Sequence, residues 1–231
     1  MDITRENVDR YQGVASFSLY APEQRIINRY LRPSMSILEL GCGAGRVTSA
    51  MGRHGLRVVA GDLDYKAVQA CRDLTAGDGV RHLQFDARCL PFKNGSVDVV
   101  LFAFNGLDYI HPETARNEAI SAIADVLKGG GLFIFSSHNP LGAVFSPRGR
   151  FWTAGYWHLR QSAWRSIRQT YFHSPAGLLL YHASPQTIVE QVTASTGLKL
   201  VEAFGLSGLS LPLSLLCLID RWPYFVFQKP A

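Results

Sequence analysis

The stretch ILELGCGAGRVTSAM, residues 37–51, places three glycines within five positions, directly behind a short apolar run that carries a carboxylate. This pattern predicts a buried strand over residues 36–41 and a helix over residues 46–53. Glycine has no Cβ and adopts left-handed backbone readily, so such a turn presents bare N–H groups at a helix N-terminus. A polar ligand is expected there, although tight packing alone would also account for the glycines.

Strands and helices alternate on both sides of this turn. Apolar runs predict further strands at residues 56–62, 81–87, 96–105 and 131–137, and two last strands in GLKLVEAF and PYFVFQKP. Helices are expected at residues 3–32, broken at Pro22; at residues 63–74; at residues 112–127, ended by Gly129, Gly130 and Gly131; and from Ser184 to about Thr196. This alternation predicts parallel pairing in an open α/β sheet.

Composition limits the class of protein. The chain has 231 residues, 47% hydrophobic and 18% charged, which is typical of one globular domain. Its four cysteines are scattered without metal-ligand or disulfide spacing. The polar start MDITRENVDRYQG lacks the pattern of a secretory signal, so we expect the cytoplasm. The apolar run 206–219 is too short to span a bilayer, which favours a buried or interface-facing segment over membrane-surface contact.

The basic charge is local. Of the net charge of +5, residues 139–183 supply five arginines with no acid and no lysine, among nine aromatic side chains. Such a segment suits an anionic or flat apolar molecule through cation–π contact and carboxylate pairing. RNA binding by stacking and phosphate contact is the alternative. We favour a small molecule because lysine is absent and no separate RNA-binding module is visible.

The spacing Gly41-x-Gly43-x-Gly45 differs from the G-x-G-x-x-G fingerprint of dinucleotide-binding turns. Glu39, two residues before the first glycine, would repel a pyrophosphate and fits a ligand with an ammonium group better. Asp62 ends the second strand, where an acid can accept both hydroxyls of a ribose.

At these residues the sequence resembles the class I S-adenosylmethionine-dependent methyltransferases, and the resemblance extends over about residues 35–137. Its motifs appear in order as ILELGCGAG, VVAGDLD, FDARCLPF, VDVVLFAFNGLDYI and LKGGGLFIFSS. The family implies a Rossmann-like, seven-stranded, mostly parallel sheet with helices on both faces, an antiparallel C-terminal strand and a substrate-cap insertion after strand five. We expect one domain: an N-terminal helical lid (1–34), a cofactor-binding core (35–138), the cap (139–183) and a C-terminal helix and strands (184–231).

The resemblance implies S-adenosyl-L-methionine as cofactor, with S-adenosyl-L-homocysteine as product and no metal. The cofactor-binding positions that it implies are Glu39, Gly41, Cys42, Gly43, Gly45, Asp62, Leu63, Asp86, Ala87, Phe104 and Asn105. Three of these side chains could instead serve the fold alone: Asp62 as a helix N-cap, a role for which Asp64 is better placed; Asp86 as a turn cap; and Cys42 as a small packing residue.

Candidate acceptor-facing residues follow strands four and five. His138 is the leading candidate for a catalytic base, with an orienting or capping hydrogen bond as the alternative, and His111 is the second candidate. Tyr11 and Tyr20 could close over the cofactor as part of the lid. The candidate substrate-binding residues are Asn139, Arg148, Trp152, Tyr156 and Trp157.

These residues favour methyl transfer to an O or N atom of a small, aromatic or anionic metabolite, with C-methylation not excluded. An RNA (tRNA) methyltransferase and a non-catalytic cofactor-binding scaffold are the alternatives. The expected partner is a small-molecule methyl acceptor; nucleic acid and a transmembrane segment are not expected, and a homodimer is left open.

Overall fold

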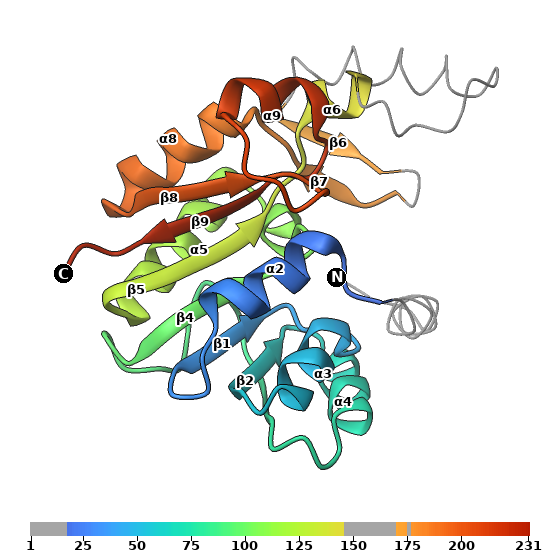
Figure 1. Cartoon of the computed structure of the whole chain (residues 1–231), viewed down its shortest axis with the longest axis vertical. Coiled ribbons are helices and arrows are strands. Elements are labelled where there is room, and N and C mark those ends of the chain that lie inside the picture. Colours follow the sequence, from blue (N-terminus) through green and yellow to red (C-terminus); the bar gives the residue numbers. More distant parts are fainter. Residues whose placement is uncertain (1–17, 146–169, 175–176) are drawn as a thin grey trace.

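The computed structural model describes residues 18–145, 170–174 and 177–231, and Figure 1 shows strands and helices alternating along most of this length. In chain order the elements are α2 (Ala21–Tyr30), β1 (Ser36–Leu40), α3 (Arg46–Arg53), β2 (Arg57–Asp62), α4 (Tyr65–Leu74), β3 (Arg81–Gln84), β4 (Val97–Phe102), the 3-10 helix η1 (Gly106–Tyr109), α5 (Glu113–Val126), β5 (Leu127–Ser136), α6 (Pro140–Phe145), β6 (Tyr171–His173), β7 (Leu179–Tyr181), α8 (Pro185–Thr196), β8 (Lys199–Phe204), α9 (Leu213–Ile219) and β9 (Tyr224–Gln228).

Seven strands form one sheet in the order β3-β2-β1-β4-β5-β9-β8. The pairs from β3 to β5 are parallel. Strand β9 runs antiparallel to both β5 and β8. The predicted mostly parallel sheet with an antiparallel C-terminal strand is therefore confirmed. The order reverses between β1 and β4, and ligands of open α/β sheets bind at the carboxyl ends of the strands at such a reversal.

Helices cover both faces of the sheet (Figure 1). Helices α5 and α8 pack on one face, where Val100 and Phe102 of β4 join their apolar side chains. Helices α2 and α3 pack on the other, together with Val99 and Leu101 of the same strand. Successive residues of a strand point to opposite faces, so a strand covered on both sides is apolar throughout, as β4 is.

The helical boundary predicted at Pro22 agrees with the start of α2. Helix α2 begins at Ala21, and Pro22 lies in its first turn, where its missing N–H costs no hydrogen bond. The helix predicted before this boundary falls mostly on residues 1–17, which lie outside the described residues.

The fifth strand begins earlier than predicted, and the glycines expected to end the preceding helix belong to it. Helix α5 ends at Val126, and Gly129, Gly130 and Gly131 lie within β5, which starts at Leu127. The register of β5 against β4 shifts between Val97 and Val99. The glycines therefore occupy an irregular strand start.

The C-terminal boundaries agree with the sequence. Ser184 Oγ accepts a hydrogen bond from the Thr187 backbone N–H at 3.1 Å, and Gly197 ends α8 with φ of +73°. The run 206–219 contains α9, in which Leu216 is buried while Leu215 and Leu218 are exposed. Among the residues placed in the structure, none of the helices is both long and apolar enough to cross a membrane.

Candidate active site

The turn between β1 and α3 is left-handed at each of its glycines, with φ of +62° at Gly41, +53° at Gly43 and +88° at Gly45. A Cβ on Gly41 would lie 2.7 Å from Phe102 Cε2, and one on Gly45 would lie 2.9 Å from Cys71 Sγ. Packing therefore requires these two glycines whether or not a ligand is bound.

The Asp62 carboxylate holds this turn from the end of β2. Its Oδ2 accepts from the Gly43 N–H at 2.9 Å, and its Oδ1 accepts from the Asp64 N–H at 3.0 Å. Burial raises the pKa of Asp62 above its usual range, against the effect of these N–H donors. Asp64, not Asp62, caps α4 by accepting from the Lys66 N–H at 3.0 Å. Each carboxylate oxygen has a second lone pair, so Asp62 can still accept hydroxyl groups.

Glu39 lies beneath the turn and is 2% exposed. Thr48 Oγ1 donates a hydrogen bond to its Oε2 at 2.6 Å. Burial raises the pKa of Glu39 to about 8, which disfavours the charged form at neutral pH. A cationic ligand group nearby would favour the carboxylate, in agreement with the ammonium-bearing ligand expected from the sequence.

The two positions expected around an adenine ring differ in their surroundings. Leu63 follows Asp62 directly and is 62% exposed, so its side chain offers free apolar surface beside the turn. Asp86 accepts from the Arg88 backbone N–H at 2.9 Å and pairs with the Arg88 guanidinium at 2.6 Å, which lowers the pKa of Asp86. Ala87 is partly buried against the core. The turn-capping role of Asp86 is thus present, and its contact with adenine stays a prediction.

Two consecutive residues after β4 adopt left-handed backbone, with φ of 53° at Phe104 and 59° at Asn105. Such conformations cost about 1–3 kcal/mol each outside glycine and concentrate at functional sites. The Asn105 N–H donates to Ser136 Oγ at 2.8 Å, which fixes this corner against β5. The Phe104 ring stacks on Tyr20 at 5.6 Å between centroids.

Cys42 is a packing residue in this turn. Its side chain is 7% exposed. A hydrogen bond with the Cys71 thiol, together with burial, raises the pKa of the Cys42 thiol. Because the thiolate is the nucleophilic form, this cysteine is not set up for covalent chemistry.

These features fit S-adenosylmethionine. The turn has left-handed glycines, the acid at the end of β2 accepts from its Gly43 N–H, and an exposed apolar residue follows that acid. In the same described ranges, no group of three or more metal-ligating side chains comes together.

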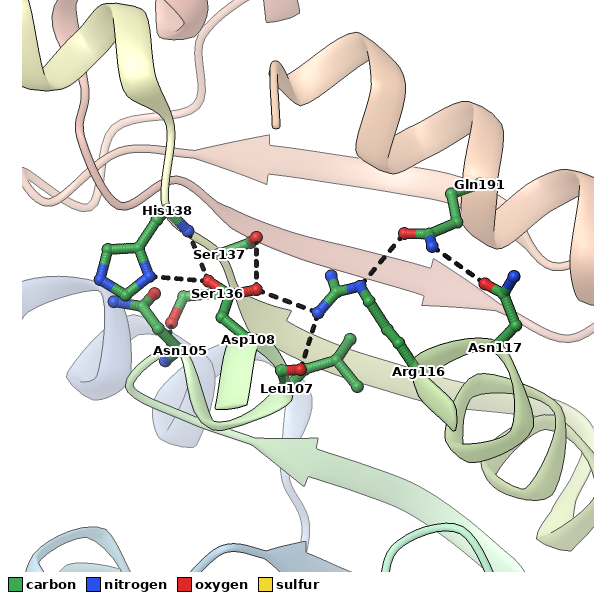
Figure 2. Close-up of polar contacts among 9 residues, drawn as sticks. All are labelled: Asn105, Leu107, Asp108, Arg116, Asn117, Ser136, Ser137, His138 and Gln191. Carbon is green, nitrogen blue, oxygen red and sulfur yellow. Dashed lines mark hydrogen bonds and ion pairs between the residues drawn. The ribbon is translucent and has the colours of Figure 1, made fainter. Parts of the chain in front are cut away.

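A buried acid orients His138 at the carboxyl end of β5 (Figure 2). Asp108 of η1 is 0% exposed, and its Oδ2 accepts from His138 Nδ1 at 2.8 Å and from the His138 backbone N–H at 2.7 Å. The His138 side chain is 18% exposed, so part of its ring reaches the surface of the site. In the neutral tautomer whose Nδ1 donates to Asp108, Nε2 is an acceptor, which is the arrangement that a general base requires.

Aromatic rings surround His138 on two sides. Phe172 of β6 and Trp222 of the α9–β9 loop meet its ring edge to face, at centroid distances of 5.5 Å and 6.1 Å. Trp222 also contacts Phe104 at 5.7 Å. The rings therefore connect the corner after β4 with His138.

The remaining candidate residues are less close to this centre. His111 packs against Tyr171 with centroids 6.5 Å apart. The Asn139 side chain is buried, and its Nδ2 donates to the carbonyls of Cys217 at 2.8 Å and Asp220 at 2.7 Å, which ties the start of α6 to the end of α9. This is a structural role, and its contact with an acceptor stays a prediction. The last candidates, Tyr11, Arg148, Trp152, Tyr156 and Trp157, lie outside the described residues.

Of the residues that contact His138, sequence reasoning singled out neither Asp108 nor Trp222, whereas Phe172 belongs to the aromatic segment 139–183. Asp108 lies within the quoted stretch VDVVLFAFNGLDYI, six residues after β4 ends, and an acid near the end of a strand was the available signal. Trp222 gave no signal, because it precedes the last strand and reaches the site only through the sheet order.

Comparisons with known proteins agree with the fold. The profile of a family described as "Methyltransferase domain" matches residues 38–135. A carboxy-S-adenosyl-L-methionine synthase of Pseudomonas putida (strain GB-1) is 34% identical over 120 residues, 47% of either chain. The ubiquinone/menaquinone biosynthesis C-methyltransferase UbiE of Legionella pneumophila (strain Corby) is 29% identical over 136 residues, 54% of this chain and 52% of that relative. The chain thus spans about half the length of the curated relatives it matches.

Among solved structures, the CcbJ methyltransferase from Streptomyces caelestis covers 100% of both chains with a TM-score of 0.72 and 19% identity. At this identity the likeness concerns the fold alone. Residues 38–135 are therefore similar to a methyltransferase domain, and the chain shares its fold with a solved methyltransferase.

Proposed function

We propose that the chain transfers a methyl group from S-adenosylmethionine to an oxygen or nitrogen atom of a small, aromatic or anionic molecule, by in-line displacement. The observation that carries this proposal is the pair of His138 and Asp108, whose Nδ1–Oδ2 distance is 2.8 Å. A hydroxyl acceptor must lose a proton near neutral pH, and this pair offers a base with a fixed orientation. Oxygen is therefore favoured over nitrogen and carbon as the acceptor atom.

Each residue has a defined task in this reaction. When bound, the cofactor supplies a methyl group already activated on a sulfonium sulfur. Asp108 holds His138 Nδ1, so Nε2 can take the acceptor proton as the new O–C bond forms and the S–C bond breaks. Phe172 and Trp222 exclude water around the imidazole and leave a flat apolar boundary.

The cofactor would lie along the glycine turn. We assign the ribose hydroxyls to Asp62 and the ammonium group to the neighbourhood of Glu39. Leu63, Asp86 and Ala87 would surround the adenine. Gly41, Cys42, Gly43 and Gly45 would contribute backbone, and Phe104 and Asn105 would face the reacting methyl group from the corner after β4.

The surroundings of His138 support a small planar acceptor. Edge-to-face rings flank it on two sides, as they would flank an aromatic molecule. Binding of RNA would instead require several phosphate contacts and would weaken steeply with salt. The predicted anionic character of the acceptor depends on arginines of residues 146–169, which lie outside the described residues.

A screen of phenolic, carboxylic and amine metabolites tests the proposal, with S-adenosylhomocysteine formation as the readout. The nucleoside product is also followed by mass, because one relative is named as a synthase of carboxy-S-adenosylmethionine. We expect S-adenosylhomocysteine to form only when an acceptor is present, and we expect His138→Gln to abolish its formation. Tight cofactor binding without turnover on any acceptor would contradict the proposal and favour a scaffold role. Turnover on RNA alone, steeply weakened by salt, would also contradict it.

A further inference from the structure

A buried guanidinium lies behind the pair of His138 and Asp108. Arg116 of α5 is 0% exposed, and its Nη1 donates to Asp108 Oδ1 at 3.0 Å and to the Leu107 carbonyl at 2.7 Å (Figure 2). Removing two charges from water is costly unless they meet with good geometry and further hydrogen bonds. Packing alone therefore does not explain why an arginine is buried at this position of α5.

The charges around Asp108 give that reason. Its Oδ1 also accepts from Ser137 Oγ at 2.8 Å, so four donors from three residues satisfy the carboxylate. Of these donors, the guanidinium is always charged, whereas the imidazole is charged only when protonated. The negative charge of Asp108 is therefore balanced without any proton on His138 Nε2.

Without this counter-charge the same geometry would oppose base catalysis. A buried carboxylate whose one cationic partner is an imidazole favours the imidazolium, since an opposite charge within about 4–6 Å stabilises the charged form by about 1–3 pH units. An imidazolium cannot accept a proton. With Arg116 in place, Asp108 contacts the ring while its charge is already paired with the guanidinium.

We propose that Arg116 is a positioning residue that neutralises Asp108 and so keeps His138 available as a base, an inference that rests on the proposed function of His138. Two further contacts hold the guanidinium, and a third holds its partner Gln191. Its Nε donates to Gln191 Oε1 of α8 at 3.2 Å. Gln191 Nε2 in turn donates to Asn117 Oδ1 at 2.9 Å. The guanidinium carbon also lies 4.1 Å from the centroid of the Tyr181 ring of β7.

Further titratable groups line the same space, and the test must separate them. His182, directly after β7, stacks on Phe172 at 4.8 Å, and the Arg221 guanidinium lies 4.1 Å from the Trp222 ring centroid. Burial raises the pKa of Tyr181, and Tyr171 and Glu113 act on it from β6 and the start of α5. Because a second imidazole and several charges lie this near, the titration of the His138 ring must be followed by its own signals.

The test follows His138 by NMR on the full chain, with ring signals assigned by their loss in His138→Gln. In the wild type at pH 7.5 the ring should be neutral, with the proton on Nδ1 and none on Nε2. In Arg116→Met the midpoint of its titration should rise by about one pH unit or more. Arg116→Lys, which retains the charge, should restore most of the difference, and the matched control Gln191→Leu, which retains the guanidinium, should leave the midpoint in place.

Two results would overturn the inference: a doubly protonated His138 in the wild type at pH 7.5, or a folded Arg116→Met variant that titrates like the wild type. The first needs no substitution of Arg116 and so can be obtained even where Arg116→Met fails to fold. Neither needs an acceptor, so a failure here is distinct from a failure of the proposed reaction. Once an acceptor is known, the acid limb of the kcat/KM profile should move upward in Arg116→Met by the same amount.

Discussion

Replacing Asp62 by alanine should weaken both cofactor binding and the stability of the fold, because one carboxylate serves both. The magnitude of each effect follows from its hydrogen bonds. Loss of charge-assisted hydrogen bonds to the ribose hydroxyls costs about 1.5–3 kcal/mol, which corresponds to a loss of at least about tenfold in cofactor affinity. The Gly43 and Asp64 backbone N–H groups, which donate hydrogen bonds to Asp62 at 2.9 Å and 3.0 Å, also lose their partner. Each costs about 1–3 kcal/mol if no water replaces the carboxylate.

Two measurements separate these effects. Calorimetric titration with S-adenosylmethionine gives the affinity, and urea unfolding without ligand gives the free energy of unfolding. Asp64→Ala is the matched control, because Asp64 lies two residues away and accepts from the Lys66 N–H to cap α4. It should lose about 0.5–2 kcal/mol of stability and leave the affinity nearly unchanged. Asp62→Ala should lose both.

The assignment of the ribose to Asp62 would be refuted if Asp62→Ala, folded at the temperature of the titration, bound the cofactor within twofold of the wild type. An equal loss of affinity in Asp64→Ala would also refute it. In that case the common cause would be a distorted start of α4, not a lost contact with the sugar.

Three more predictions concern buried or half-buried groups. His138→Ala should reduce turnover by about 10²–10⁴-fold and leave cofactor affinity within twofold; equal loss of both would mean a structural role. Burial raises the pKa of Glu39 from 4.5 to about 8, so the contribution of this group to the stability of the ligand-free wild type should be complete below about pH 4.5 and be lost as pH rises through 8. Glu39→Gln should lack that fall in urea unfolding at pH 5 and pH 8.5, and parallel curves would contradict the burial argument. Arg46→Met leaves the 1% exposed Glu23 carboxylate without its ion pair and should cost about 3–5 kcal/mol. The double variant with Glu23→Gln should cost less than Arg46→Met alone, and additive losses would mean that the two side chains do not interact.

The sheet could be predicted because its signals are local. Each of the five motifs combines an apolar run with a turn or an acid, and β1, β2 and β4 occur within the predicted ranges. The predicted start of β5 was wrong because glycine occurs in two kinds of local structure. Glycine both ends helices and occupies irregular strand starts, as Gly129 does in β5.

The acceptor side was less predictable because its contacts join distant parts of the chain. Asp108 and His138 are 30 residues apart, and only the parallel pairing of β4 with β5 brings them together. Arg116 lies near the start of α5, and a charged residue on a helix is usually exposed to solvent. The hydrogen bonds from the Asn139 amide to carbonyls at the end of α9 also join distant parts of the chain, 78 residues apart. Sequence periodicity carries no information on such pairings.

A crystal structure of the chain with S-adenosylhomocysteine tests the proposed site most directly. We expect the nucleoside along the glycine turn of β1, with both ribose hydroxyls on Asp62 and the sulfur directed towards His138. A ligand elsewhere, or one in the turn whose sulfur faces away from His138, would contradict both the cofactor site and the role of the base.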